Sequence, residues 1–139
     1  MKEIEEIQEE HIIMRESLNE IEMLIARERY EEMSLLKERL LAFAALWEKH
    51  EKKEEVFFNE LKSINPAFAN EMMFLNQHRQ LRGHWKVIKD AINRSREDTL
   101  NFWITLETDG KMMFDKFRQH INAEDDFLNN LGRPMMIPA

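Results

Sequence analysis

The sequence contains no cysteine and few of the residues that interrupt helices. The absence of cysteine excludes disulfides, thiolate metal sites and a cysteine nucleophile. Three glycines and three prolines among 139 residues leave little material for turns. The abundance of Glu, Leu, Lys, Arg and Met favours helix in what remains. The composition therefore predicts long helices joined by short connections.

Other missing features exclude whole classes of partner. No apolar run approaches the roughly 20 residues that span a bilayer, and the first residues are too acidic and amphipathic for a signal peptide. The formal net charge of −7 disfavours non-specific binding to nucleic acid or to an anionic membrane. We therefore expect a cytoplasmic protein that forms one domain over residues 1–139, with neither nucleic acid nor membrane as a partner.

Apolar residues recur every three or four positions along four segments, which is the period of one helix face. This pattern predicts four helices followed by a short C-terminal tail, over residues 2–29, 31–63, 66–93 and 96–130. Four amphipathic helices with short connections favour an all-α fold, an antiparallel up-and-down four-helix bundle.

The predicted helix boundaries differ in how clearly they are marked. Asn65 and Pro66 are typical of a helix start, and Ser95 with Asp98 has the spacing of a capping box before the fourth helix. The join near Arg29 contains neither glycine nor proline. Gly110 falls on the apolar stripe of the fourth helix, where it could admit a close neighbour or a bend.

One twelve-residue pattern occurs twice, as HEKKEEVFFNEL from His50 and as HINAEDDFLNNL from His120. Each copy places a glutamate four residues after its histidine, on the same helix face. With two more histidines, every predicted helix has one histidine on its apolar stripe, and the inward polar set is His11, His50, Glu54, His78, His120 and Glu124. Equal residue counts from the same end of the bundle put these positions at one level.

Carboxylates that face a helical core are unfavourable unless they are paired or bind a metal. A single histidine on an apolar stripe is usually a packed core residue, and a single His-x-x-x-Glu is often a solvated helix pair. The complete set, contributed by four helices, instead predicts a metal site in the core of the bundle. Imidazole and carboxylate ligands without sulfur suit iron, manganese or zinc better than copper(I).

These residues resemble the hemerythrin-like family, four-helix bundles with His-His-Glu cation-binding motifs. The resemblance covers essentially the whole chain and rests on His11 and the segments HEKKEEVFF, NQHRQLR and HINAEDDFL. It implies a non-haem centre of two iron ions, with other divalent metals open. Two carboxylates would bridge the metals and two histidines would complete each one: Glu54 and Glu124, with His11 and His50 on one metal and His78 and His120 on the other.

The sequence departs from the oxygen-carrying hemerythrins one turn after His78, where Arg82 replaces a second histidine. His84 lies about 240° around the helix from His78, so we interpret it as a boundary residue beside Trp85. One metal would then have a position that is open, filled by water, or filled by the carboxylate of Glu51.

The bridging carboxylate of the fourth helix has two candidates, Glu124 and Asp125. The family places this residue four or five positions after its histidine. We prefer Glu124, because it lies on the apolar stripe and repeats Glu54; Asp125 would then be in solvent or behind a ligand.

The leading functional hypothesis is a di-iron protein that binds dioxygen, or a related molecule such as nitric oxide, for carriage, storage or sensing. Alternatives are a di-iron oxidase or peroxidase and an iron-responsive metal-binding module. No separate acid, base or substrate motif is visible, which disfavours the enzyme. A homo-oligomer or a signalling partner remains open. The inward carboxylates disfavour a metal-free structural bundle.

Overall fold

The computed structural model describes residues 2–65 and 72–132, and helix is the only regular structure within them. The elements are α1 (Lys2–Arg27), a 3₁₀ turn η1 (Tyr30–Glu32), α2 (Met33–Ile64), α3 (Met72–Asn93), α4 (Thr99–Thr105), a π-helical segment η3 (Leu106–Gly110) and α5 (Lys111–Gly132). The elements α4, η3 and α5 follow one another without a break and form the last helix of the bundle.

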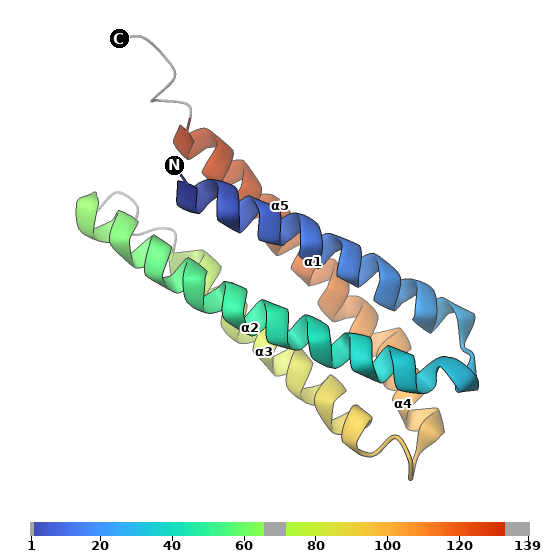
Figure 1. Ribbon diagram of the computed structural model, residues 1–139. Helices are drawn as coiled ribbons and strands as arrows, with labels where there is room; N and C mark the ends of the chain where they lie inside the picture. The colour runs from blue at the N-terminus through green and yellow to red at the C-terminus, as the bar shows by residue number, and fades with distance from the viewer. Residues whose placement is uncertain (1, 66–71, 133–139) are drawn as a thin grey trace.

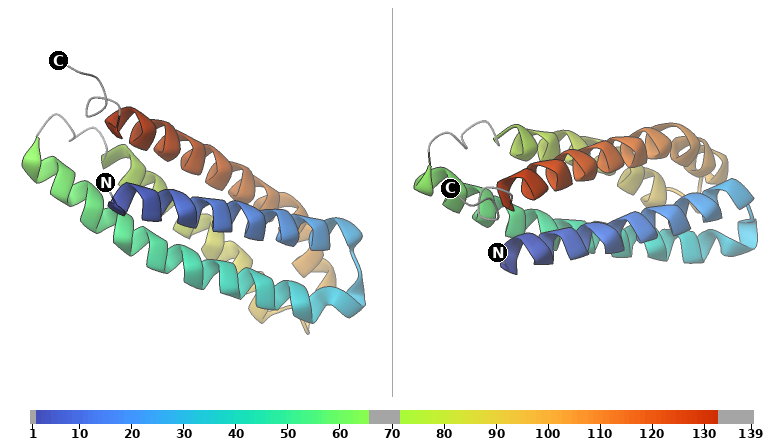
Figure 2. Two further views of the ribbon diagram at one scale, coloured as in Figure 1. Left: turned by 45° about the horizontal axis from the view of Figure 1, so that its top comes forward. Right: turned by 90° about the horizontal axis from the view of Figure 1, so that it is seen from above.

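The four long helices lie side by side and alternate in direction (Figure 1). Helix α1 packs on α2 and α5, and α3 packs on α2 and α5, so the arrangement closes around one core (Figure 2). The start of α1 and the end of α5 lie at the same end of the bundle. The predicted all-α, up-and-down four-helix bundle is therefore confirmed.

The first helix ends at Arg27, two residues before its predicted end. Glu28 follows with a φ of 49°, the left-handed conformation that commonly ends a helix, and its N–H donates to the Ile25 carbonyl over 3.1 Å. A non-glycine residue in this conformation leaves no glycine or proline signal in the sequence. The next long helix accordingly begins at Met33, after the 3₁₀ turn, and not at residue 31.

The last helix begins at Thr99 and not at residue 96, because Asp98 is its N-cap and accepts a hydrogen bond from the Asn101 N–H over 2.9 Å. Ser95 instead donates to the Ile92 carbonyl, so it does not open a capping box. Asn65 is the C-cap of α2, and the predicted helix start at Pro66 lies outside the described residues.

Gly110, where the sequence allowed either a close neighbour or a bend, is the last residue of the π-helical segment η3. The nearest atoms that a Cβ atom at this position would meet belong to Leu106 and Phe114, at 3.7 Å, which is ordinary contact.

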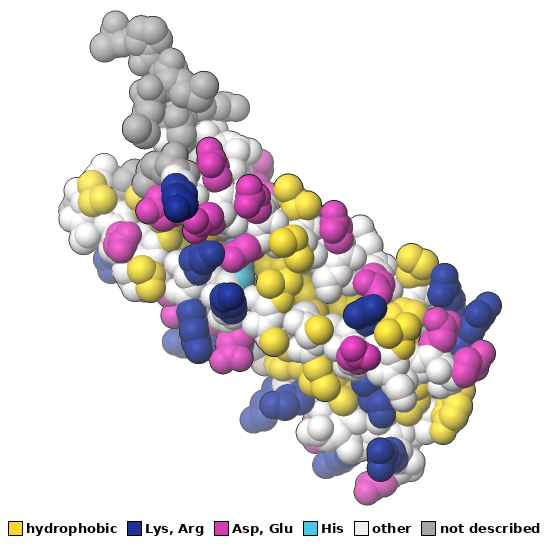
Figure 3. All heavy atoms as spheres, viewed as in Figure 1, with side chains coloured by type: hydrophobic (Ala, Val, Ile, Leu, Met, Phe, Trp, Pro, Cys, Tyr) yellow, Lys and Arg dark blue, Asp and Glu magenta, His cyan; other side chains and the backbone are white. Residues whose placement is uncertain are grey.

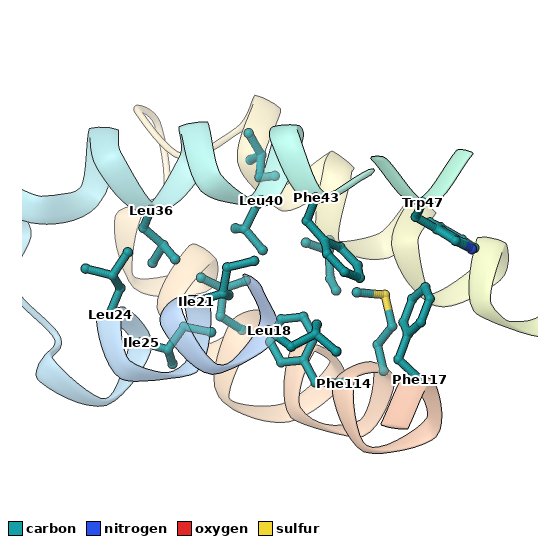
Figure 4. Close-up of a cluster of buried hydrophobic side chains, with 14 of the residues drawn as sticks. Leu18, Ile21, Leu24, Ile25, Leu36, Leu40, Phe43, Trp47, Phe114 and Phe117 are labelled. Atoms are coloured by element: carbon teal, nitrogen blue, oxygen red, sulfur yellow. The ribbon is translucent and has the colours of Figure 1, made fainter. Parts of the chain in front are cut away.

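A layer of buried polar side chains divides the core into two apolar clusters. The larger cluster joins Leu18 and Ile21 of α1 to Phe43 of α2 and Phe114 of α5 (Figure 4). The smaller cluster, at the other end, contains Ile4, Ile7, Phe57, Phe58, Leu61, Phe74 and Leu128. The surface over α1 and α2 mixes acidic and basic side chains and shows almost no histidine (Figure 3). Among the described helices, none is long and apolar enough to cross a membrane.

Candidate metal centre

All six inward residues predicted from the sequence meet in the polar layer between the two apolar clusters. Each is at most 5% exposed, and together they come from four helices: His11 of α1, His50 and Glu54 of α2, His78 of α3, and His120 and Glu124 of α5. The helical period explains the convergence, because each glutamate lies one turn after a histidine on the same face.

Two overlapping groups of four ligands are present within this layer, and they share both glutamates. In the first, His11, His50, Glu54 and Glu124 have ligand atoms within 4.8 Å of one another. His11 Nε2 lies 3.3 Å from a Glu124 oxygen and 3.6 Å from Glu54 Oε2. His50 Nε2 lies 3.1 Å from Glu54 Oε1.

The second group replaces the two N-terminal histidines by His78 and His120. His78 Nε2 is 3.2 Å from Glu54 Oε1, and His120 Nε2 is 3.1 Å from Glu124 Oε1. The two Nε2 atoms are 3.0 Å apart. The two groups are therefore adjacent, and each has two histidines of its own and shares both carboxylates with the other.

The ligand atoms in this layer fit a cation because several have no other partner. His11 Nε2, His50 Nε2, Glu54 Oε2 and both oxygens of Glu124 are buried and make no hydrogen bond to any described residue. Buried polar atoms are nearly always hydrogen-bonded, so a concentration of exceptions requires an explanation. Nitrogen and oxygen donors around one point are the ligands that iron, manganese and zinc accept.

The opposite nitrogens of three histidine rings are fixed by polar side chains from neighbouring helices. The Nδ1 contacts are His11 with Asp125 at 2.6 Å, His50 with Glu10 at 2.6 Å, and His120 with Gln77 at 2.5 Å. An Nδ1–H that donates to an oxygen leaves the Nε2 lone pair facing the cluster, as metal-binding histidines require.

Basic side chains support two of these ring contacts from outside. Arg15 donates to Asp125 over 2.7 Å, and Lys53 donates to Glu10 over 2.8 Å. The sequence analysis missed Glu10 and Gln77, which lie beside predicted ligands in the chain but contact histidines on a different helix. Their adjacency to His11 and His78 is the signal that could have suggested them.

The electrostatics of the cluster also favour positive charge. Burial alone would lower the pKa of His11, but contacts with Asp125, Glu124 and Glu54 outweigh burial and raise this pKa to about 11. Burial alone would raise the pKa of Glu54, whereas Glu124 and the surrounding histidines hold it well below its usual value. Ionised carboxylates in a core need counter-charge, which a metal ion supplies as well as a proton does.

The model of the hemerythrin HHE cation-binding domain matches residues 2–130. The chain belongs to the hemerythrin family. No curated protein and no solved structure gives a significant match. A cation-binding domain of this family and a buried cluster of histidine and glutamate agree on metal binding.

The other predicted site residues of this hemerythrin-like domain lie around the cluster. Asp125 belongs to neither four-residue group and contacts His11 Nδ1 instead. Glu51 is buried and forms a close ion pair with Arg82. His84 is half-buried outside the cluster, where Lys116 Nζ lies 2.9 Å from its Nε2.

Proposed function

We propose that this hemerythrin-like domain holds two iron ions and binds a small molecule such as dioxygen or nitric oxide. Glu54 and Glu124 would bridge the ions, His11 and His50 would serve the first, and His78 and His120 the second. The observation that carries the proposal is the pair of shared, buried carboxylates: Glu54 Oε2 and both oxygens of Glu124 have no hydrogen-bond partner among the described residues.

Iron with protein ligands from two histidines and two bridges would have a coordination position left to bind a small diatomic molecule. The two other carboxylates predicted as possible ligands are already paired, Glu51 with Arg82 and Asp125 with His11 Nδ1 and Arg15. This pairing supports a coordination position on one iron that is free to bind an added small molecule.

The side chains around the cluster exclude water from it. On the side of the larger apolar cluster, Trp47 and Phe117 pack edge to face with their ring centroids 4.9 Å apart. On the side of the smaller cluster, Phe57 is buried. The ring centroids of Phe74 and His120 are 6.0 Å apart. A dry, apolar surrounding slows loss of a bound molecule and unwanted oxidation, which supports binding over turnover.

Iron content tests the paired centre. Protein loaded anaerobically with Fe²⁺ and freed of excess should contain two iron ions per chain by elemental analysis. His84→Ala is the matched control, because it removes a histidine that lies outside both ligand groups, and it should also retain two. A folded protein that retains one ion or none contradicts the proposal.

Absorption spectra test the bound molecule. Exposing the reduced, loaded protein to air should produce a new absorption band that disappears when oxygen is removed. Irreversible oxidation of the iron without such a band would contradict oxygen carriage and favour the di-iron oxidase alternative.

A further inference from the structure

A third group of ligands leads from the cluster toward solvent. Ligand atoms of Glu51, Glu55 and His78 lie within 4.8 Å of one another. Their exposure rises outward: His78 is 1% exposed, and the side chains of Glu51 and Glu55 are 9% and 43% exposed. Because His78 belongs to this group and to the second four-residue group, the two are continuous.

His78 differs from the other three histidines of the cluster. Its Nδ1 is buried and has no hydrogen-bond partner among the described residues, whereas the rings of His11, His50 and His120 are each fixed at Nδ1. A ring without this restraint can turn and offer either nitrogen to an approaching cation.

A groove between α2 and α3 opens onto these carboxylates. It has a volume of about 480 Å³, and its lining includes Trp47, Glu51, Glu55, Arg82, Trp85 and Lys89. The groove also contains Lys52, which lies 3.6 Å from Glu48. A hydrated metal ion would therefore reach Glu55 from the surface, because the side chain of Glu55 is 43% exposed.

Arg82 already places positive charge between the two carboxylates. Its Nη2 is in close contact with Glu51 Oε1 and lies 3.6 Å from Glu55 Oε1. The Arg82 side chain is 55% exposed, so it can swing into solvent without leaving a cavity in the core. The position of the guanidinium indicates that the space between Glu51 and Glu55 can accept a cation. In this position Arg82 also blocks the groove.

A second groove, between α3 and α5, reaches His120 and has the opposite character. The described residues that line it are Gln77, Gln80, Leu81, Lys116, Gln119, His120 and Ala123, and none of these has a carboxylate. With a lysine and no counter-charge, this groove disfavours a divalent cation.

We propose that the α2–α3 groove is the route by which a divalent metal ion reaches the cluster. The ion would pass from Glu55 to Glu51 and then to His78, and displacement of Arg82 opens the path. This inference rests on the proposed metal centre, since it concerns how that centre is loaded.

The rate of metal uptake tests the route. The metal-free full chain is mixed with Co²⁺, and the visible absorption of bound Co²⁺ is followed with time. Glu55→Gln should load about fivefold more slowly, the factor that one unit charge exerts on a divalent ion roughly 8 Å away in water. Arg82→Gln should load faster by a similar factor. Both variants should still bind two ions per chain, and the differences should shrink at high salt.

Two controls make the result specific. Glu38→Gln makes the same charge change about 25 Å away along α2, and Lys116→Gln alters the second groove; both should load at the wild-type rate. Equal rates for all variants, with two ions bound, would overturn the route and leave the centre intact. A rate altered by Lys116→Gln and not by Glu55→Gln would also overturn it. A wild-type chain that binds neither Co²⁺ nor Fe²⁺ would overturn the centre as well.

Discussion

Glu124 and Asp125 are adjacent carboxylates with different surroundings. Successive residues of a helix point about 100° apart, so only one of the two can face the cluster. Glu124 is fully buried and belongs to both ligand groups. The side chain of Asp125 is 20% exposed and lies between His11 Nδ1 and Arg15. The geometry supports Glu124 as the bridge and Asp125 as the residue that orients His11.

We therefore expect Glu124→Ala to abolish binding of at least one metal ion. Asp125→Ala should keep two ions but bind them roughly 10- to 100-fold more weakly, because the His11 ring loses its hydrogen-bond acceptor. Metal analysis gives the stoichiometry, and titration against a chelator gives the affinity. Circular dichroism of both variants checks that they fold. Loss of metal from the Asp125 variant alone would reverse the assignment.

Sequence could predict the six cluster residues because all lie on the apolar stripe of their own helix. It could not predict which residues hold the rings from behind. Glu10, for example, lies beside His11 in the chain but contacts His50 on another helix. Such contacts depend on how one helix is rotated against the next, which the period within a single helix does not contain. The pairing of Arg82 with Glu51 was missed for the same reason.

At the scale of the elements, the connection between α1 and α2 depends on Glu28. Its φ of 49° brings the Cβ atom close to the backbone, at a cost of about 1 kcal/mol relative to glycine. Glu28 is exposed, and its N–H donates to the Ile25 carbonyl. Because glutamate has no preference for this conformation, neither propensity nor spacing could predict where α1 ends.

Glu28→Gly should stabilise the protein by up to about 1 kcal/mol, because glycine adopts this φ without strain. Thermal unfolding should then show a melting temperature higher by a few degrees. Glu28→Ala is the control, since it removes the carboxylate but keeps the Cβ atom, and it should show no such gain. Equal effects of both substitutions would assign the change to the side chain and not to the backbone.

At the scale of the whole molecule, the bundle could be predicted from four apolar stripes because each helix can bury only one face. The division of the core into two clusters also follows from the stripes, where each histidine interrupts an apolar run. The π-helical segment within the last helix could not be predicted from the sequence, because the apolar spacing there is compatible with an unbroken α-helix.

The polar layer should make stability depend on metal. Metal binds to the folded cluster around Glu54 and Glu124 and not to the unfolded chain, so it stabilises the folded state by mass action. Metal at 100 times its dissociation constant should stabilise the fold by about 2.7 kcal/mol, which corresponds to a melting temperature roughly 5–10 °C higher. Calorimetry of the metal-free and loaded protein measures this shift. Equal melting of the two forms, with metal bound in one, would contradict it.

The division of ligands between the halves of the chain has a mechanical consequence. The hairpin of α1 and α2 supplies His11, His50 and Glu54, and the hairpin of α3 and the last helix supplies His78, His120 and Glu124. Neither hairpin alone contains a group of four. Two bound ions would therefore act as a pair of cross-links between the halves. Disulfides have this role in other small proteins, but this chain has no cysteine to form them. Removing the metal would therefore remove both cross-links between the two hairpins.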